Sequence, residues 1–539
     1  MREILKYFKE EYFFGLMVLI HLIPLFQGPF LPTMDGAAHL YNSNLILQEL
    51  YGNETVSQFF SMNSEWVPNW SGHFILAFFN SFLPGYLAEK IFLLIYFIGL
   101  PYAFRYFLKT LQPDGNAYLL SYFILPFCYS FMMLMGFYNF SIAILFFFLS
   151  AAYWIQNRDQ LSWKKTIILG LLLLSTYFSH LVVFGLLIFV LFVHLLLSVV
   201  SKNMKEVFSV RTFFLDLWQT SWKLALASVI PLLLAASYFF SRSENTDVNY
   251  LEFRELVDWL KNLRPLIMYH EEIEGSKTIK MVYLFAILFV VGMFSKINRI
   301  QLDSNSTLST QVKSFFNQLF HFNDLWLGLS LFVLYLYFKL PDGAQGAGFI
   351  SVRLGYIFYL FILIWIALQR LPKWFIWFNV ICMLYLNYNL NVFYKQNAID
   401  LNKTAIACSE LSQEIEPNSI VLPINRSNHW IHGHFSNYLG IDKSMIILEN
   451  YEASVDYFPL KWNWDDMANT SLGNLKIHEI ECLWWPQNNE NEKKSVDYVF
   501  ILGQLNIDNP CDSGLQVELS NSFSLVKNNE FCSLYKLNH

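Results

Sequence analysis

Charged residues are scarce in this chain. They make up 14% of its 539 residues, whereas 55% are hydrophobic and 18% aromatic. A soluble globular protein of ordinary composition has about a quarter charged residues, so these proportions exclude that class and predict a polytopic membrane protein. The formal net charge of −6 is small for the length. It indicates neither a nucleic acid nor another polyanion as a partner.

Other absences narrow the architecture. The chain has no internal repeat and no low-complexity segment, so it is neither a solenoid nor a tethering sequence. Basic residues precede the first apolar segment, but no small-residue cleavage site follows it. We therefore expect that segment to be retained as a membrane span and not removed as a signal peptide.

Cysteine is also scarce, with six residues. Cys128 and Cys382 lie in apolar segments, where packing roles are expected. The other four lie in the polar C-terminal region and allow three pairings: Cys408, Cys482, Cys511 and Cys532. If that region is outside the cell, they are expected to pair. We prefer Cys511 with Cys532, because the segment between them can fold back as strands, which leaves Cys408 with Cys482.

Apolar stretches long enough to span a bilayer are frequent. Eleven candidates lie near residues 12–31, 86–108, 117–135, 138–155, 165–179, 181–200, 222–240, 279–295, 325–340, 351–369 and 374–392. A twelfth stretch, 73–84, is too short to cross comfortably, and we expect it to be re-entrant or interfacial.

Lysine and arginine gather at one set of span ends, which predicts the orientation. The basic ends are residues 2–9, 105–109, 158–165, 202–223, 296–313 and 370–373. The first predicted external loop, 32–85, contains neither residue type, and the loop at 241–278 has mixed charge and is expected to have a structure of its own. The N-terminus is therefore predicted to face the cytoplasm, and the chain after about residue 393 to face outside.

The predicted fold is an all-α polytopic membrane domain with about 11 transmembrane helices, residues 1–392, and an extracytoplasmic α/β domain, residues 393–539. In the second domain a helical stretch leads into SIVLPI and VDYVFILG, short apolar runs typical of buried strands. FSLV and FCSLYKL, separated by KNNE, predict a closing hairpin.

An acid and an imidazole stand four residues apart just after the first apolar segment, in PTMDGAAHLY at 32–41. If this stretch is helical, the spacing puts Asp35 and His39 on one face. Ionisable groups at the mouth of a membrane are costly, so they indicate a functional site. The alternative is that Asp35 only caps a helix.

The predicted topology brings further polar side chains to the outer face. Glu65 and His73 belong to the first external loop, Asn139 to the GFYNF turn, His180 to TYFSH, and His270 to the 241–278 loop. Taken singly, a residue such as His180 is more often an ordinary interfacial histidine, and one such as Asn139 a helix cap.

The loop KLPDGAQGAGFISVRLGY at 339–356 is the second informative stretch. Its glycines, Gly343, Gly346 and Gly348, allow a flexible or closely approached backbone. Arg353 enters the following span, where it needs an anionic partner, and its planar fork of donors suits a phosphate. A structural pair with Asp35 or Glu89, or extension of the side chain toward the headgroups, is the alternative.

These motifs together resemble the GT-C superfamily of integral-membrane glycosyltransferases, which use polyprenyl-phosphate-linked sugars. The resemblance rests on MDGAAHLY in the first external loop, FISVRLGY in a late one, the many spans and the C-terminal α/β domain. GFYNF and the SH of TYFSHLVVF resemble elements of bacterial branches of the superfamily. The resemblance implies a multi-pass protein of the bacterial inner membrane.

The resemblance also implies roles for individual residues. Asp35, with His39, would be the catalytic base or organise the acceptor; Arg353, with His180, would bind the donor phosphate. Asn139, His73, Glu65 and His270 would contact substrate. The implied partners are a polyprenyl-phosphate-linked sugar donor, a glycan, lipid or protein acceptor, and membrane lipids, with no nucleic acid.

The chain departs from the superfamily's two-acid form, because Gly36 and Ala37 follow Asp35. No set of metal ligands is specified, no cofactor is certain, and a divalent cation stays open. If NHWIHGHFSNYLG is extended, His432 and His434 point to one face, but no third ligand is evident. Two other functions stay open: a transporter or flippase of a lipid-linked substrate, and a non-catalytic assembly protein with a GT-C-like fold.

Overall fold

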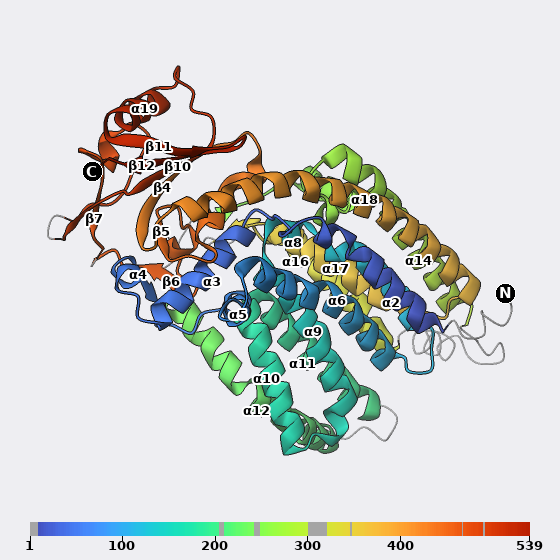
Figure 1. Ribbon diagram of the computed structural model, residues 1–539. Coiled ribbons are helices and arrows are strands. Elements are labelled where there is room, and N and C mark those ends of the chain that lie inside the picture. Colours follow the sequence, from blue (N-terminus) through green and yellow to red (C-terminus); the bar gives the residue numbers. More distant parts are fainter. Residues whose placement is uncertain are drawn as a thin grey trace, which may run out of the picture. The chain divides into compact units, whose positions relative to one another are not determined.

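The computed structural model describes residues 9–203, 210–241, 248–299, 321–344, 348–465, 467–488 and 491–538 (Figure 1). Gly346 lies outside these ranges, as do parts of the predicted basic ends 2–9, 202–223 and 296–313 and of the 241–278 loop. The chain divides into two compact units. One comprises Met1–Leu22, Ile95–Met133 and Phe140–Phe393; the other comprises Ile23–Leu94, Leu134–Asn139 and Tyr394–His539.

The first unit, called the helical unit below, is built from apolar helices. They are α2 (Glu10–His21), most of α6 (Gly85–Leu111), η2 (Ala117–Ile124), α7 (Leu125–Cys128), α8 (Phe131–Met135, its first residues only), α9 (Tyr138–Asn157), α10 (Trp163–Ser179), α11 (Leu181–Asn203), α12 (Val210–Phe240), α13 (Phe253–Lys261), η4 (Arg264–Leu266), α14 (Glu271–Ile297), η5 (Phe322–Asp324), α16 (Leu325–Lys339), α17 (Ile350–Ala367) and the first half of α18 (Lys373–Leu411). A short ladder pairs β2 (Val248–Asn249) with β3 (Gly343–Ala344).

Helix α12 illustrates why these segments need lipid. Leu226, Ile230 and Leu233 recur at helical spacing and are 45%, 62% and 65% exposed. Leu224 and Ala227, on the opposite side, are buried. A helix with an apolar stripe on its outer face as well as its inner face is stable in hydrocarbon and not in water.

Seven of the described helical segments are long and apolar enough to cross a membrane. Each of the eleven predicted segments contains a helix, but α2, α10, α16 and α18 do not meet both criteria. The prediction of one helix over 12–31 is wrong: α2 has 12 residues, about 18 Å of helix, and ends at His21 before η1 (Ile23–Phe26). Pro24 explains the break, since it cannot continue the hydrogen-bond ladder. Stretch 73–84 forms the short helix α5 (Ser71–Asn80), and the 241–278 loop ends earlier than expected, where α14 begins.

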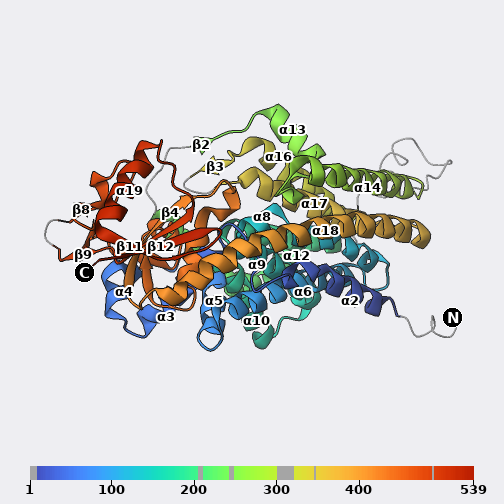
Figure 2. The ribbon, with the colours of Figure 1, turned by 45° about the horizontal axis from the view of Figure 1, so that its top comes forward.

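The second unit, called the mixed unit below, joins the C-terminal region to the first predicted external loop. Its main sheet has the order β11-β12-β10-β4-β5, with β4 (Ser419–Arg426), β5 (Met445–Ile447), β10 (Tyr498–Gly503), β11 (Phe523–Asn528) and β12 (Cys532–Leu537). Strands β10 and β4 are parallel neighbours and almost wholly buried, and β11 and β12 form a hairpin. The predicted strands and hairpin are therefore confirmed. Helix α19 (Pro510–Ser522) lies beside β11 and β12 (Figure 2).

Smaller elements complete the mixed unit. A three-stranded sheet has the order β8-β7-β9, with β7 (Asn469–Leu472), β8 (Leu475–Lys476) and β9 (Lys493–Ser495). The remaining short helices are η6 (Ser412–Glu414), η7 (Trp430–Gly440), η8 (Glu452–Ser454) and η9 (Ile477–Glu479).

Hydrogen bonds attach the first loop to the C-terminal region. This loop contains α3 (Gly36–Leu50), α4 (Glu54–Phe59) and β1 (Phe60–Met62), and β1 pairs with β6 (Leu460–Trp462). The Tyr41 hydroxyl donates to the Met445 carbonyl at 3.0 Å and accepts from the Ile447 amide at 2.9 Å. The carboxamides of Asn42 and Asn450 exchange two hydrogen bonds. Helix α3 is consequently joined to β5 through Tyr41 within the same unit.

The predicted disulfide pairing is wrong. Cys482 is bonded to Cys511, at the start of α19, with 5.4 Å between the Cα atoms. Cys532 begins β12 and lies beside Cys408 of α18, with 3.4 Å between the sulfur atoms, and both thiols are free and buried. The segment between Cys511 and Cys532 forms helix α19 followed by strand β11, and not strands alone, and Cys532 lies beside Cys408 of α18 instead. Cys128 is buried, as expected of a packing residue.

Breaking the Cys482–Cys511 bond should destabilise the mixed unit. The bond closes a loop of 29 residues. Its removal in Cys482→Ser should cost about 2–4 kcal/mol, because the unfolded chain regains loop entropy. Peptide mapping without reductant should recover these two cysteines in one linked peptide, and thermal unfolding of Cys482→Ser in detergent should shift down. Cys382→Ser, far from this loop in sequence, is the control, and recovery of a Cys511–Cys532 peptide would contradict the assignment.

Candidate functional site

Asp35 is held against the GFYNF turn by backbone contacts within the mixed unit. Its amide donates to the Met135 carbonyl at 3.0 Å. Gly136 has a φ of +94°, and a Cβ at that position would lie 2.8 Å from the Asp35 nitrogen. Only glycine adopts this conformation freely and leaves that space. Gly136 of GFYNF therefore forms a close backbone contact with the MDGAAHLY segment at Asp35.

The Asp35 side chain does not cap the helix it precedes. The Gly36 amide at the start of α3 donates instead to the Thr33 hydroxyl at 3.0 Å, and Asp35 makes no side-chain capping bond. The capping interpretation of Asp35 is therefore wrong. Its carboxylate is left for other groups: it accepts a hydrogen bond from the Tyr451 hydroxyl and lies 3.7 Å from Nε2 of His434.

Burial dominates the electrostatics of Asp35, whose side chain is 9% exposed. Burial raises the pKa of Asp35 to about 6, although the nearby imidazoles of His434 and His39 act to lower it. His434 is itself paired through Nδ1 with Glu449 at 2.8 Å. Burial acts to lower the pKa of His434, but the hydrogen bond to Glu449 and the charges of Glu449 and Asp35 outweigh it and raise the pKa.

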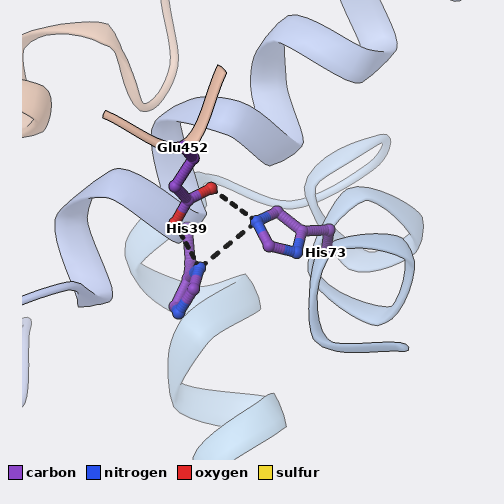
Figure 3. A group of neighbouring side chains, drawn as sticks. All are labelled: His39, His73 and Glu452. Carbon is purple, nitrogen blue, oxygen red and sulfur yellow. Dashed lines mark hydrogen bonds and ion pairs between the residues drawn. The ribbon is translucent and has the colours of Figure 1, made fainter. Parts of the chain in front are cut away.

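A second cluster lies one helical turn further along α3, where His39 meets His73 of α5 and Glu452 of η8 (Figure 3). His39 Nδ1 is 2.6 Å from one Glu452 oxygen, and His73 Nε2 is 2.7 Å from the other. The two ring nitrogens are 3.2 Å apart. All three side chains are buried. Figure 3 shows them converging on one point from three separate segments.

Each imidazole of this cluster is oriented by a backbone carbonyl. His39 Nε2 lies 2.8 Å from the Gly136 oxygen, and His73 Nδ1 lies 3.3 Å from the Asn69 oxygen. Burial acts to raise the pKa of Glu452, but the two imidazoles outweigh it and lower the pKa to about 2. Burial acts to lower the pKa of His39, but Glu452 and Asp35 outweigh it and raise the pKa. The cluster thus retains a buried carboxylate.

The other residues predicted to contact substrate have different surroundings. Both polar atoms of the Asn139 side chain hold the start of α5: its oxygen accepts from the Gly72 amide at 2.7 Å, and its nitrogen donates to the Asn69 carbonyl at 2.9 Å. Glu65 is exposed in the segment before α5. His270 belongs to the helical unit, where its ring accepts from the Ile273 amide and caps α14.

The two residues predicted to bind the donor phosphate meet at one aromatic ring of the helical unit. His180, between α10 and α11, contacts the Phe140 ring at 5.2 Å between centroids. The Arg353 guanidinium, on α17, lies 5.7 Å from the centroid of the same ring. Asp342 anchors the preceding loop: its carboxylate accepts from the Ser351 amide at 2.9 Å.

The sequence analysis did not identify three residues that lie around Asp35 and His39. These are Glu449, Tyr451 and Glu452, in LENYEAS directly after β5. Acids just after a buried parallel strand were the available signal, because ligand sites form at the carboxyl ends of such strands. The extended conformation considered for NHWIHGHFSNYLG is wrong. The stretch forms η7, His432 bonds the Ser427 hydroxyl, and His434 turns to Glu449.

No protein-family model matches the chain. No curated protein matches it either. Among solved structures, the chain is similar to ArnT from Cupriavidus metallidurans bound to undecaprenyl phosphate. The sequence identity is 10% and the TM-score 0.35, and the alignment covers 97% of this chain and 97% of that chain.

Removing the charge of Asp35 should stabilise the folded protein at alkaline pH. The Asp35 carboxyl has a pKa of about 6 in the folded protein and of about 4 in an unfolded chain. The folded protein therefore loses stability as the pH rises through that interval, because folding then requires an ionised carboxylate to be buried. Asp35→Asn should therefore gain about 1–3 kcal/mol at pH 8, and the gain should vanish at pH 4. Thermal unfolding in detergent at both pH values measures this.

The matched control is Asp456→Asn, which removes a carboxylate that is 81% exposed in the same unit and should change nothing. If Asp35→Asn instead loses stability at pH 8, Asp35 is a structural ion-pair partner.

Proposed function

We propose that this protein is a membrane glycosyltransferase that transfers a sugar from a polyprenyl-phosphate-linked donor to an acceptor hydroxyl on the extracytoplasmic face of the bacterial inner membrane. The acceptor is a glycan, a lipid or a protein. The proposal combines the motif resemblance with the geometry around Asp35.

The buried Asp35 carboxylate is the observation that carries the proposal. It is not used to cap α3, and it is held by a glycine turn, Tyr451 and His434. Burial raises its pKa to about 6, so it is ionised at neutral pH and is a stronger base than an exposed carboxylate. A protein gains little stability from such a costly group, whereas a general base needs it.

In the proposed reaction the acceptor oxygen attacks the anomeric carbon of the donor. The bond from that carbon to the phosphate oxygen breaks, and polyprenyl phosphate leaves with the bonding electrons. The acceptor proton passes to Asp35, and the anomeric configuration inverts. His434 and Tyr451 hold the Asp35 carboxylate in one orientation, which removes the need to order it during the reaction.

We assign the donor phosphate to Arg353 and His180. Both side chains contact Phe140, so the ring fixes the guanidinium and the imidazole together. The guanidinium offers a planar fork of N–H donors that matches two phosphate oxygens. Their helices belong to the part of the chain with lipid-exposed apolar faces, where a polyprenyl tail is soluble.

The experiments below also test two other functions. A transporter or flippase of a lipid-linked substrate would bind the donor and leave its sugar attached. A non-catalytic assembly protein would leave the donor unchanged and tolerate loss of Asp35 chemistry.

The decisive experiment follows release of polyprenyl phosphate from polyprenyl-phosphate sugars by mass spectrometry, using the full-length protein in membranes that contain the native acceptors. Asp35→Asn should slow the release by about 100-fold or more, because it removes the base, while binding of the donor lipid stays within about twofold. Asp456→Asn is the control and should keep the wild-type rate. Wild-type turnover by Asp35→Asn would exclude the proposed role.

Replacing the fork of Arg353 should weaken binding of the lipid phosphate. Arg353→Lys keeps a positive charge but loses the bidentate geometry, so the Kd for polyprenyl phosphate should rise about tenfold with an unchanged unfolding temperature. Arg264→Lys is the matched control: Arg264 lies over the Phe131 ring at 4.6 Å in the same helical unit and has no assigned contact with the donor. An equal effect of both substitutions would point to lost packing and against a phosphate site.

A further inference from the structure

We propose that His39, His73 and Glu452 bind a divalent transition-metal ion of the zinc class. The proposal does not depend on glycosyl transfer. It rests on the convergence of three ligand atoms, on the direction of the two imidazoles and on the burial of the cluster (Figure 3).

The spacing of the ligand atoms suits one small ion. One atom from each of the three side chains lies within 4.8 Å of the others. Two ligands bonded to zinc at about 2.0–2.1 Å at a tetrahedral angle are about 3.3 Å apart. His39 Nδ1 and His73 Nε2 are 3.2 Å apart. The Glu452 oxygens are closer to these nitrogens, so the carboxylate withdraws by roughly half an ångström when an ion of this bond length enters.

The backbone carbonyls decide which ring nitrogen carries a lone pair. A carbonyl only accepts hydrogen bonds, so His39 Nε2 donates to Gly136 and His73 Nδ1 donates to Asn69. In the neutral rings His39 Nδ1 and His73 Nε2 therefore bear lone pairs. These face each other and the Glu452 carboxylate, so either protons or a metal cation must lie between the three groups. Imidazoles oriented in this way by carbonyls are typical of metal ligands.

The donor set and the burial select the class of ion. Two imidazoles and one carboxylate form a set that zinc uses in proteins, with one position left for water or substrate, whereas magnesium and calcium prefer oxygen ligands. The side chains of His39, His73 and Glu452 are 4%, 0% and 1% exposed. A buried carboxylate needs compensation, which a divalent cation supplies.

The ion would join three segments that are distant in sequence. His39 lies in the first turn of α3, four residues after Asp35, whose carbonyl accepts from the His39 amide at 3.0 Å. His73 lies on α5, and Glu452 begins η8. Metal binding would therefore hold the start of α3 in place, and we assign His39 a positioning role toward Asp35 in addition to its role as a ligand.

The test measures metal content and requires no sugar donor, so its failure is separate from failure of the transferase proposal. The full-length protein is purified in detergent with a tag that lacks histidine, and metals are measured by mass spectrometry. We expect about one zinc ion per chain. Removing it with 1,10-phenanthroline should lower the unfolding temperature, and Zn²⁺ or Co²⁺, but not Mg²⁺, should restore it.

Variants locate the ion. His73→Ala and Glu452→Gln should reduce the zinc content at least tenfold, whereas His432→Ala, which removes a buried histidine bonded to Ser427, should retain it. His73→Cys keeps a zinc ligand, so its Co²⁺ form should bind metal and add a thiolate-to-cobalt absorption band that the wild type lacks.

If His73→Ala does not fold, the spectrum of the Co²⁺ form of His73→Cys still tests whether residue 73 binds the metal. Protein that takes up neither Zn²⁺ nor Co²⁺, or equal metal content in His73→Ala, Glu452→Gln and wild type, would overturn the proposal.

Discussion

The close approach of Gly136 to Asp35 is the constraint on which the candidate site depends. A Cβ at Gly136 would lie 2.8 Å from the Asp35 nitrogen, and the neighbouring carbonyls of Met135 and Gly136 accept from the Asp35 amide and from His39. One short turn thus fixes the backbone before α3, the orientation of the His39 ring and the position of the Asp35 carboxylate. A side chain at residue 136 would displace all three together.

The buried carboxylates near this turn are compensated by neighbouring side chains. Asp35 and Glu452 are both buried carboxylates, and each is compensated differently: Asp35 by Tyr451 and by His434 at 3.7 Å, Glu452 by two imidazoles at 2.6 and 2.7 Å. The weakly compensated carboxyl has a raised pKa, and the strongly compensated one a lowered pKa. A buried carboxyl with a raised pKa suits the role of base that we propose for Asp35.

The part of the site that depends on local sequence was predictable, and the part that depends on folding was not. The proximity of Asp35 and His39 followed from their spacing, because Asp35 immediately precedes α3 and His39 lies in its first turn. Strands β4 and β10 and the β11–β12 hairpin followed from short apolar runs. Glu452 could not be connected to His39, since 412 intervening residues separate them and only the pairing of β1 with β6 and the bonds from Tyr41 to β5 bring them together. The disulfide pairing failed for the same reason, because the neighbour of Cys532 depends on where β12 enters the sheet.

The two units differ in how they satisfy their polar groups. The mixed unit satisfies its buried polar groups with carbonyls, carboxamides and strands, as a protein core in contact with water does. The helical unit satisfies its backbone within helices and exposes apolar side chains such as Ile230 and Leu233, as hydrocarbon requires. Arg353 belongs to the helical unit, where its guanidinium lies over the Phe140 ring that His180 also contacts. Its planar fork of donors suits a phosphate, and the exposed apolar faces suit a lipid tail, which is why we propose Arg353 for the donor and Asp35 for the acceptor proton.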